Sequence, residues 1–173
     1  MANEQLVMRA DRRMFMGVTS DDTTTYKRMI GFSTLTESKN PTEYSRKYVD
    51  EYSETVDVTG MSSSYDFTFD MLTPNDVLDD LANIIDSEKL GSETVRSFVS
   101  VDFNKPATGG GFEAVKRDFA VIGNSVGDGT DALVYSGTLR AKTSRVVGTA
   151  TIATPSGGNK ENVETITFTE ESD

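Results

Sequence analysis

The sequence contains no histidine and no cysteine among its 173 residues. Without histidine the chain lacks the commonest general base and the commonest metal ligand of proteins, and Ser–His and Cys–His nucleophile pairs are excluded. Carboxylates, lysines and tyrosines remain as groups that could catalyse a reaction, but they form no recognisable catalytic motif. The sequence therefore predicts a protein that is not an enzyme and has no cofactor. The lack of cysteine also fits a reducing compartment.

Basic residues are few relative to acidic ones. The 17 Lys and Arg stand against 28 Asp and Glu, which gives a net charge of −11. Such a chain repels phosphate backbones, so we expect no specific binding of nucleic acid. No stretch approaches the roughly 20 apolar residues of a membrane-spanning helix, and the first residues lack the apolar core of a signal peptide. We therefore expect synthesis in a cytoplasm and no membrane partner.

Most of the chain has the alternation of β-strands. Val95, Val99, Val101 and Phe103 share one face of a predicted strand, and Gly-, Asn- and Pro-containing turns separate such segments. The predicted strands cover residues 6–9, 13–18, 26–35, 43–52, 55–58 joined to 65–69, 95–103, 112–122, 132–141, 145–153 and 163–169. No repeat or low-complexity linker divides the chain, so we expect a single domain over residues 1–173. The expected fold is mainly β, a β-sandwich or barrel.

One segment, about residues 74–90, has helical periodicity instead. Thr73 is the predicted N-cap, Pro74 the first helical residue and Gly91 the residue after the helix. Its apolar residues recur on one stripe, opposite acidic residues that we expect to be solvated. The sequence thus predicts one amphipathic α-helix that flanks the sheet.

Residues 39–71 say the most about function. Phe67 and Phe69 share a face of an ordinary half-buried strand, whereas in residues 43–52 tyrosines and charged residues alternate so that neither face can form a dry core. Tyrosine and arginine are enriched where proteins meet each other. We therefore predict a strand that another chain completes, with contacts made by Lys39, Tyr44, Arg46, Tyr48, Asp50 and Tyr52. Two alternatives stay open: a carbohydrate-binding row of tyrosines, and an exposed hairpin without an assembly role.

Other motifs favour simple structural interpretations. Residues 127–131 (GDGTD) lack the spaced carboxylates of a calcium loop and predict a tight turn. The glycines at 109–111 and 157–158 lack the spacing of phosphate-binding loops. No metal site is predicted.

Charge is also distributed unevenly along the chain. Arg9, Arg12 and Arg13 lie near the start, whereas the acidic C-terminal segment (about residues 155–173) has no basic residue from Glu161 onward. Oppositely charged ends suit head-to-tail contacts between copies, or a contact between the two ends of one copy.

Four segments, residues 3–18, 31–51, 58–70 and 121–141, carry a resemblance to a known family. Together with the predicted helix they cover nearly the whole chain in the expected order. The chain resembles the major tail proteins, or tail tube proteins, of long-tailed, siphovirus-type bacteriophages of Gram-positive bacteria. The match is one of overall pattern, and residues 155–173 contribute least to it.

The resemblance implies a β-sandwich with a flanking helix whose copies form hexameric rings. The rings stack into a tube around a tape-measure protein, and tail terminator and distal tail proteins are further partners. Assembly would take place in the host cytoplasm, the protein would reside in the virion tail, and double-stranded DNA would pass through without specific binding. In this family a long loop or hairpin between early strands contacts neighbouring subunits, and by position it corresponds to about residues 39–52.

An acidic bore would let the DNA slide, because each phosphate contact with Lys or Arg adds affinity and drag. The predicted lumen-lining acids are Glu43, Glu51, Asp66 and Asp70. Two other functions stay open: the tube subunit of a contractile tail or tailocin, and a carbohydrate- or receptor-binding β-sandwich module.

Overall fold

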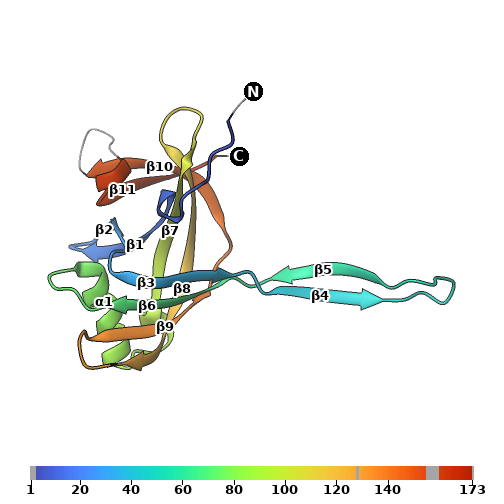
Figure 1. The fold of residues 1–173 in the computed structure, drawn as a ribbon, viewed down its shortest axis with the longest axis horizontal. Helices are drawn as coiled ribbons and strands as arrows, with labels where there is room; N and C mark the ends of the chain where they lie inside the picture. Colours follow the sequence, from blue (N-terminus) through green and yellow to red (C-terminus); the bar gives the residue numbers. More distant parts are fainter. Residues whose placement is uncertain (1–2, 128, 155–159, 173) are drawn as a thin grey trace.

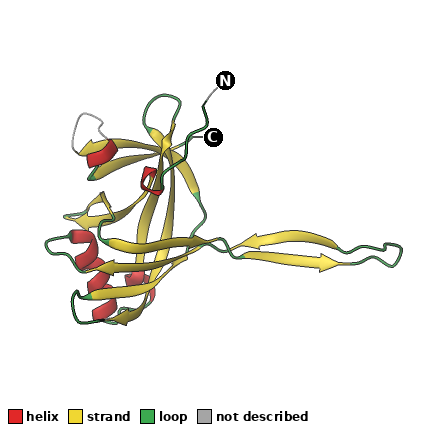
Figure 2. Ribbon diagram, in the orientation of Figure 1, coloured by secondary structure: helices red, strands yellow, loops and turns green. Residues whose placement is uncertain are grey.

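The computed structural model describes residues 3–127, 129–154 and 160–172 (Figure 1). In these residues most of the structure is β, with a single α-helix against the sheet (Figure 2). Nine strands form one sheet in the order β10-β11-β2-β1-β7-β8-β9-β6-β3, and β4 pairs only with β5. The strands are β1 (Arg12–Ser20), β2 (Thr23–Arg28), β3 (Phe32–Ser38), β4 (Pro41–Arg46), β5 (Thr55–Met61), β6 (Ser64–Asp70), β7 (Val95–Pro106), β8 (Phe112–Val126), β9 (Val134–Ala141), β10 (Val146–Thr154) and β11 (Thr165–Glu170). The helix is α1 (Asp76–Asp86), and 3-10 turns cover Arg9–Asp11, Gly91–Thr94 and Lys160–Asn162.

Six of the strands close into a barrel. β10 pairs with β11 on one side and with β8 on the other, so β10, β11, β2, β1, β7 and β8 form a continuous ring. Closure leaves these strands without an open edge between them. The barrel interior is filled by buried side chains of five strands and of the segment before β11: Phe15, Val99, Val101, Phe103, Ala114, Ala150, Val163 and Ile166.

A second core lies between α1 and the sheet that continues from the barrel. β9, β6 and β3 extend from β8, and their inner residues pack with the apolar stripe of the helix. The buried members are Met14, Met16, Phe67, Phe69, Val77, Leu78, Leu81, Ala82, Ile84, Phe98, Phe119, Val121, Tyr135 and Leu139. β1, β7 and β8 are therefore buried on both faces, which is why β1 reads Met-Phe-Met rather than alternating with polar residues.

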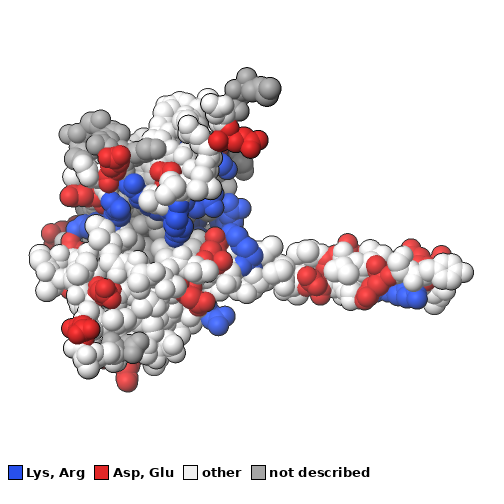
Figure 3. All heavy atoms as spheres, in the orientation of Figure 1, with Lys and Arg blue, Asp and Glu red and all other residues white. Residues whose placement is uncertain are grey.

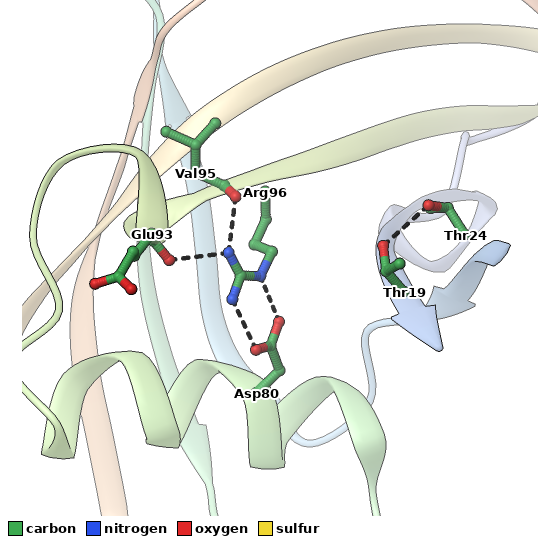
Figure 4. A network of polar contacts seen from close by, with 6 residues as sticks. All are labelled: Thr19, Thr24, Asp80, Glu93, Val95 and Arg96. Carbon is green, nitrogen blue, oxygen red and sulfur yellow. Dashed lines mark hydrogen bonds and ion pairs between the residues drawn. The ribbon is translucent and has the colours of Figure 1, made fainter. Parts of the chain in front are cut away.

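The helix is held at its start and in its middle. Asn75 is the N-cap, because its side-chain oxygen accepts from the N–H groups of Val77 and Leu78 at 3.1 and 3.2 Å. Asp80 forms a two-bond ion pair with Arg96 of β7, at 2.6 and 2.9 Å, shown in Figure 4 with the Thr19–Thr24 contact of the β1–β2 hairpin. This hydrogen-bonded carboxylate raises the pKa of Arg96.

The mainly β fold with a single flanking helix is confirmed in the described residues, with six strands in a closed barrel. Several predicted boundaries are wrong. The helix begins at Asp76 after the N-cap Asn75, rather than at Pro74 after Thr73. It ends at Asp86 with Ser87 as its C-cap, rather than at the predicted cap Gly91. Residues 26–35 split into β2 and β3, since Gly31 turns the chain with φ +88°. Residues 6–9 form no strand.

Candidate assembly interface

A two-stranded arm projects from the body of the protein (Figure 1). The arm consists of residues 41–61, with β4 antiparallel to β5 and a tip between them at residues 47–54. Every residue of β4 is exposed, and in β5 only Gly60 is partly covered. The predicted segment without a core is therefore one half of a hairpin that packs against nothing else in the described chain.

The root of the arm continues the β3–β6 ladder through a kink. Ser38 is paired with Ser64, and the Ser62 N–H then donates to the Asn40 carbonyl at 3.2 Å before β4 and β5 begin. Asn40 has a positive φ of 44°, and its side-chain amide donates to the Ser64 hydroxyl at 3.0 Å. The kink turns both strands of the hairpin in the same direction, so the arm points away from the sheet.

One face of the arm carries an aromatic–cation stack, which we call the arm stack: Tyr44, Arg46 and Tyr48. The guanidinium carbon of Arg46 lies 5.2 Å from the ring centroid of Tyr44 and 5.0 Å from that of Tyr48. Cation–π contacts at exposed sites contribute about 0.5–1 kcal/mol each. The stack therefore holds three interface-type side chains in a defined arrangement while leaving Tyr44 and Tyr48 about half exposed.

The opposite face of the arm and its tip are also uncovered. Val56 and Val58 of β5 are 54% and 63% exposed, opposite Ser45 and Glu43 of β4. Val49 and Tyr52 at the tip are fully exposed. An isolated hairpin is only marginally stable in water, and both arm strands present open edges. The arm therefore presents aromatic and apolar side chains and two open strand edges that no other described part of the chain covers.

The predicted contact residues divide between three places. The arm stack lies along β4 and the start of the tip, and Asp50 and Tyr52 lie in the tip itself, because the strand ends at Arg46 and not at Tyr52. Lys39 lies at the root, where its ammonium group pairs with Glu37. The predicted strand over residues 43–52 is thus wrong in its second half. The sequence prediction also missed that β5 is the partner of β4 and belongs to the arm.

The four predicted lumen-lining acids do not lie together. Glu43 and Glu51 are on the arm, whereas Asp66 and Asp70 are exposed on the face of β6 that points away from α1. Asp66 accepts a hydrogen bond from Thr138 of β9 at 3.1 Å. In register with β6, this outer face of β3, β6 and β9 carries mainly hydroxyl and carboxylate side chains, which we call the hydroxyl face: Thr34, Thr36, Asp66, Thr68, Asp70, Ser136 and Thr138. Val134 and Arg140 of β9 lie on the same face, opposite Asp70 and Ser64.

A groove lies beside the root of the arm. Its lining includes Arg12, whose guanidinium lies 3.0 Å from the carboxylate of Asp102. Burial raises the pKa of Asp102, but the Arg12 hydrogen bond and the Asn104 N–H outweigh it, so the pKa is lowered overall. The Tyr65 hydroxyl also lines the groove, and burial together with the neighbouring Glu37 raises its pKa strongly.

The two ends of the chain meet in part within one copy. The Arg28 guanidinium donates to the Glu161 carbonyl at 3.5 Å, and the Glu161 charge acts on Arg13, although burial and Arg28 lower the pKa of Arg13 overall. Residues 155–159 and 173 of the predicted acidic segment lie outside the described residues.

Of the remaining glycine motifs, the one at residues 109–111 lies wholly within the described residues. Gly109, Gly110 and Gly111 all have positive φ between β7 and β8, while the glycines at 157 and 158 and residue 128 lie outside the described residues. Over the described ranges, no group of acidic side chains has the arrangement of a metal site. Within the same residues, no helix has the length and apolar character needed to cross a membrane.

Two solved structures of phage-type tails are similar to this chain. The tail of an empty GTA particle, refined with C6 symmetry, matches with a TM-score of 0.58 and 11% identity over 81% of this chain and 97% of that chain. The SPP1 tail tube, from solid-state NMR and cryo-EM, matches with a TM-score of 0.57 and 14% identity over 82% of this chain and 78% of that chain. The sequence matches no protein-family model and no curated protein.

The similarity shows that the chain shares the fold of these two tail proteins.

Proposed function

We propose that the protein is the tail tube subunit of a siphovirus-type bacteriophage of Gram-positive bacteria. Its copies form hexameric rings that stack into a tube in the virion tail, assembled in the host cytoplasm. The observation that carries the proposal is the arm, a hairpin exposed along its whole length on a fold shared with assembled tails. The arm contacts neighbouring subunits through the arm stack, Asp50 and Tyr52, and Lys39 contacts them at the root of the arm.

The character of the arm favours a protein interface over a sugar-binding row. Tyr44 and Tyr48 each face Arg46, so their rings are already paired with a cation. Aromatic anchors combined with arginine are the composition typical of protein interfaces.

In this tube the hydroxyl face lines the bore, with Asp66 and Asp70 as its acids. Five of its seven side chains are serine or threonine, and Arg140, at the end of β9, is the one basic residue that the strand pairings place on the same face. Such a surface offers few cations to phosphates, so duplex DNA passes with little of the affinity that each Lys or Arg contact adds. Glu43 and Glu51 serve the arm in this arrangement rather than the bore. A tape-measure protein fills the bore before ejection, and tail terminator and distal tail proteins bound its ends.

Electron microscopy of the purified protein, before and after concentration, tests the proposal. Hollow tubes with six-fold symmetry are the expected result. Monomers that stay dispersed at high concentration, with or without a nucleating tail-tip fraction, would count against the function. A sheath around the tube in particles that contain the protein would instead identify the tube of a contractile tail.

A further inference from the structure

Two adjoining grooves, of about 470 and 280 Å³, lie between the barrel and the helix-bearing part of the sheet. They share Arg12, Met14, Glu37, Tyr65 and Ser100, so we treat them as one surface, the basic groove. Figure 3 shows Lys and Arg gathered in a band on this face, close to the root of the arm. The walls come from β1, β3, β6, β7, β8 and β10 and from the β7–β8 loop.

The basic groove is positive on a strongly negative protein. Seven basic side chains line it against four acidic ones, a local net of +3 where the whole chain has −11. The basic members are Arg9, Arg12, Arg13, Lys39, Lys105, Arg117 and Arg145; the acidic members are Glu37, Asp102, Glu113 and Glu171. Seven of the 17 basic residues of the chain are thus concentrated on one concave surface.

Part of this charge has no carboxylate partner. Arg12 pairs with Asp102, Lys39 with Glu37, and Lys105 lies 3.7 Å from Glu113. Within the described part of the chain, neither Arg117 nor Arg145 forms an ion pair; Arg117 donates only to the Thr143 carbonyl, at 2.6 Å. Two guanidinium groups are therefore available to an anionic partner.

The arm has the opposite charge. Residues 41–61 contain five acidic and two basic side chains, a net of −3, and three of the acids (Asp50, Glu51 and Glu54) are in the tip. At about 3.4 Å per residue, the six residues of β4 carry this tip roughly 20 Å from the root. The arm points away from the body, so the tip does not reach the groove at its own root (Figure 1).

We propose that the arm of one copy docks in the basic groove of the next copy, with the acidic tip against Arg117 and Arg145. The inference rests on the proposed function and names the receiving surface for the arm. Charge complementarity matches a −3 hairpin to a +3 groove, and each copy carries one of each. Such a contact is heterologous, so it propagates from copy to copy until a ring closes or a tube extends.

The absence of cysteine allows a direct test by cross-linking. One batch carries Ser53→Cys in the tip, and a second, mass-tagged batch carries Thr108→Cys on the rim of the groove; the two are mixed with a bis-maleimide. The expected result is a mixed dimer at least fivefold stronger than with Ser20→Cys, an exposed position outside the groove. Equal yields for Thr108→Cys and Ser20→Cys would overturn the proposal.

Charge reversal tests the chemistry of the same contact. Arg117→Glu with Arg145→Glu in the groove batch should lower the mixed-dimer yield at least fivefold. The matched control, Arg140→Glu with Lys142→Glu, makes the same charge change at exposed positions outside the groove and should leave the yield unchanged. Pairing the reversed groove with an arm batch that carries Glu51→Lys and Glu54→Lys should restore the yield to within about twofold. Failure to restore it, with circular dichroism showing folded variants, would overturn the proposal.

The outcomes separate this contact from the proposed function and from nucleic-acid binding. Mixed dimers without tubes by microscopy would refute the proposed function and support the contact. Tubes without mixed dimers would support the proposed function and refute the contact. A 100-base-pair duplex at 50 mM salt serves as the second probe. If the charge reversal in the groove abolished binding of this duplex but left the cross-links intact, the groove would be a nucleic-acid-binding site, and the proposed contact would be wrong.

Discussion

Removing the arm should abolish assembly without weakening the fold. In the native protein the Ser62 N–H donates to the Asn40 carbonyl at 3.2 Å. If only two residues separated Asn40 from Ser62, this same hydrogen bond would close a four-residue β-turn. Replacing residues 41–61 by Gly-Gly therefore closes the β3–β6 hairpin at its existing pair. A deletion of residues 40–52 alone would instead leave β5 without its partner strand.

The expected change in stability follows from burial. The arm contributes no residue to either core, so its removal costs little of the free energy of unfolding. Shortening the connection from 21 residues to two lowers the entropy cost of closing the loop by about 2 kcal/mol, since each doubling of length costs about 0.6 kcal/mol. We expect the free energy of unfolding to be unchanged or higher by up to about 2 kcal/mol. That upper limit corresponds to a rise in Tm of roughly 4–8 °C for a domain of this size.

Urea denaturation and sedimentation measure the two halves of this prediction. The slope of the unfolding free energy against urea should stay near that of the wild type, because the arm buries little surface. Tubes should be absent from the pelleted fraction at concentrations where the wild type polymerises. A loss of more than about 1 kcal/mol would show that the arm supports the core, and tubes of normal appearance would show that it has no role in assembly.

The remaining predictions concern single features. Replacing the three residues of the arm stack by Ser should leave a folded monomer that no longer polymerises, and electron microscopy showing tubes of normal length would refute the contact. Asp66→Asn with Asp70→Asn should leave tubes intact and slow DNA release from particles severalfold; unchanged release kinetics would sink the acidic-bore proposal. Asn75→Ala should cost about 1 kcal/mol in urea unfolding through loss of the N-cap of α1, so an unchanged midpoint would contradict the assigned cap. The lowered pKa of Asp102 stabilises the fold above the ordinary Asp value of about 3.9, and this contribution, at most about 1 kcal/mol, is lost as pH falls through the folded pKa. Asp102→Asn should therefore lower the urea midpoint at pH 7 and have no effect near pH 2, and an equal effect at both would contradict the ion pair.

The sequence predicted the arm because neither face of residues 43–52 has the apolar alternation of a strand that is buried on one side. Tyr44, Arg46 and Tyr48 share a strand face that no core could bury, and the structure has them exposed on β4 and the tip. The end of the strand was missed because nothing in residues 43–52 marks Arg46 as its last residue. The tip reverses the chain through a turn in which the Glu51 N–H donates to the Tyr48 carbonyl, and alternation alone does not predict such a turn.

Helix boundaries show a second limit. Thr73 and Asn75 are both good N-cap residues, and Pro74 favours Thr73. The burial of Val77, Leu78 and Leu81 against the sheet favours Asn75, because the helix must begin where its apolar stripe meets β1 and β8. This choice depends on packing and is not encoded in the local sequence.

By itself the sequence determined the mainly β class, the amphipathic helix and the segment without a core. These depend on periodicity and composition, which act over a few residues. Only the tertiary structure decided that β8 pairs with β10 to close a barrel, and that β1, β7 and β8 serve two cores. It also decided that basic residues from positions 9 to 145 meet in one groove, because their proximity is set by strand order and register over the whole chain.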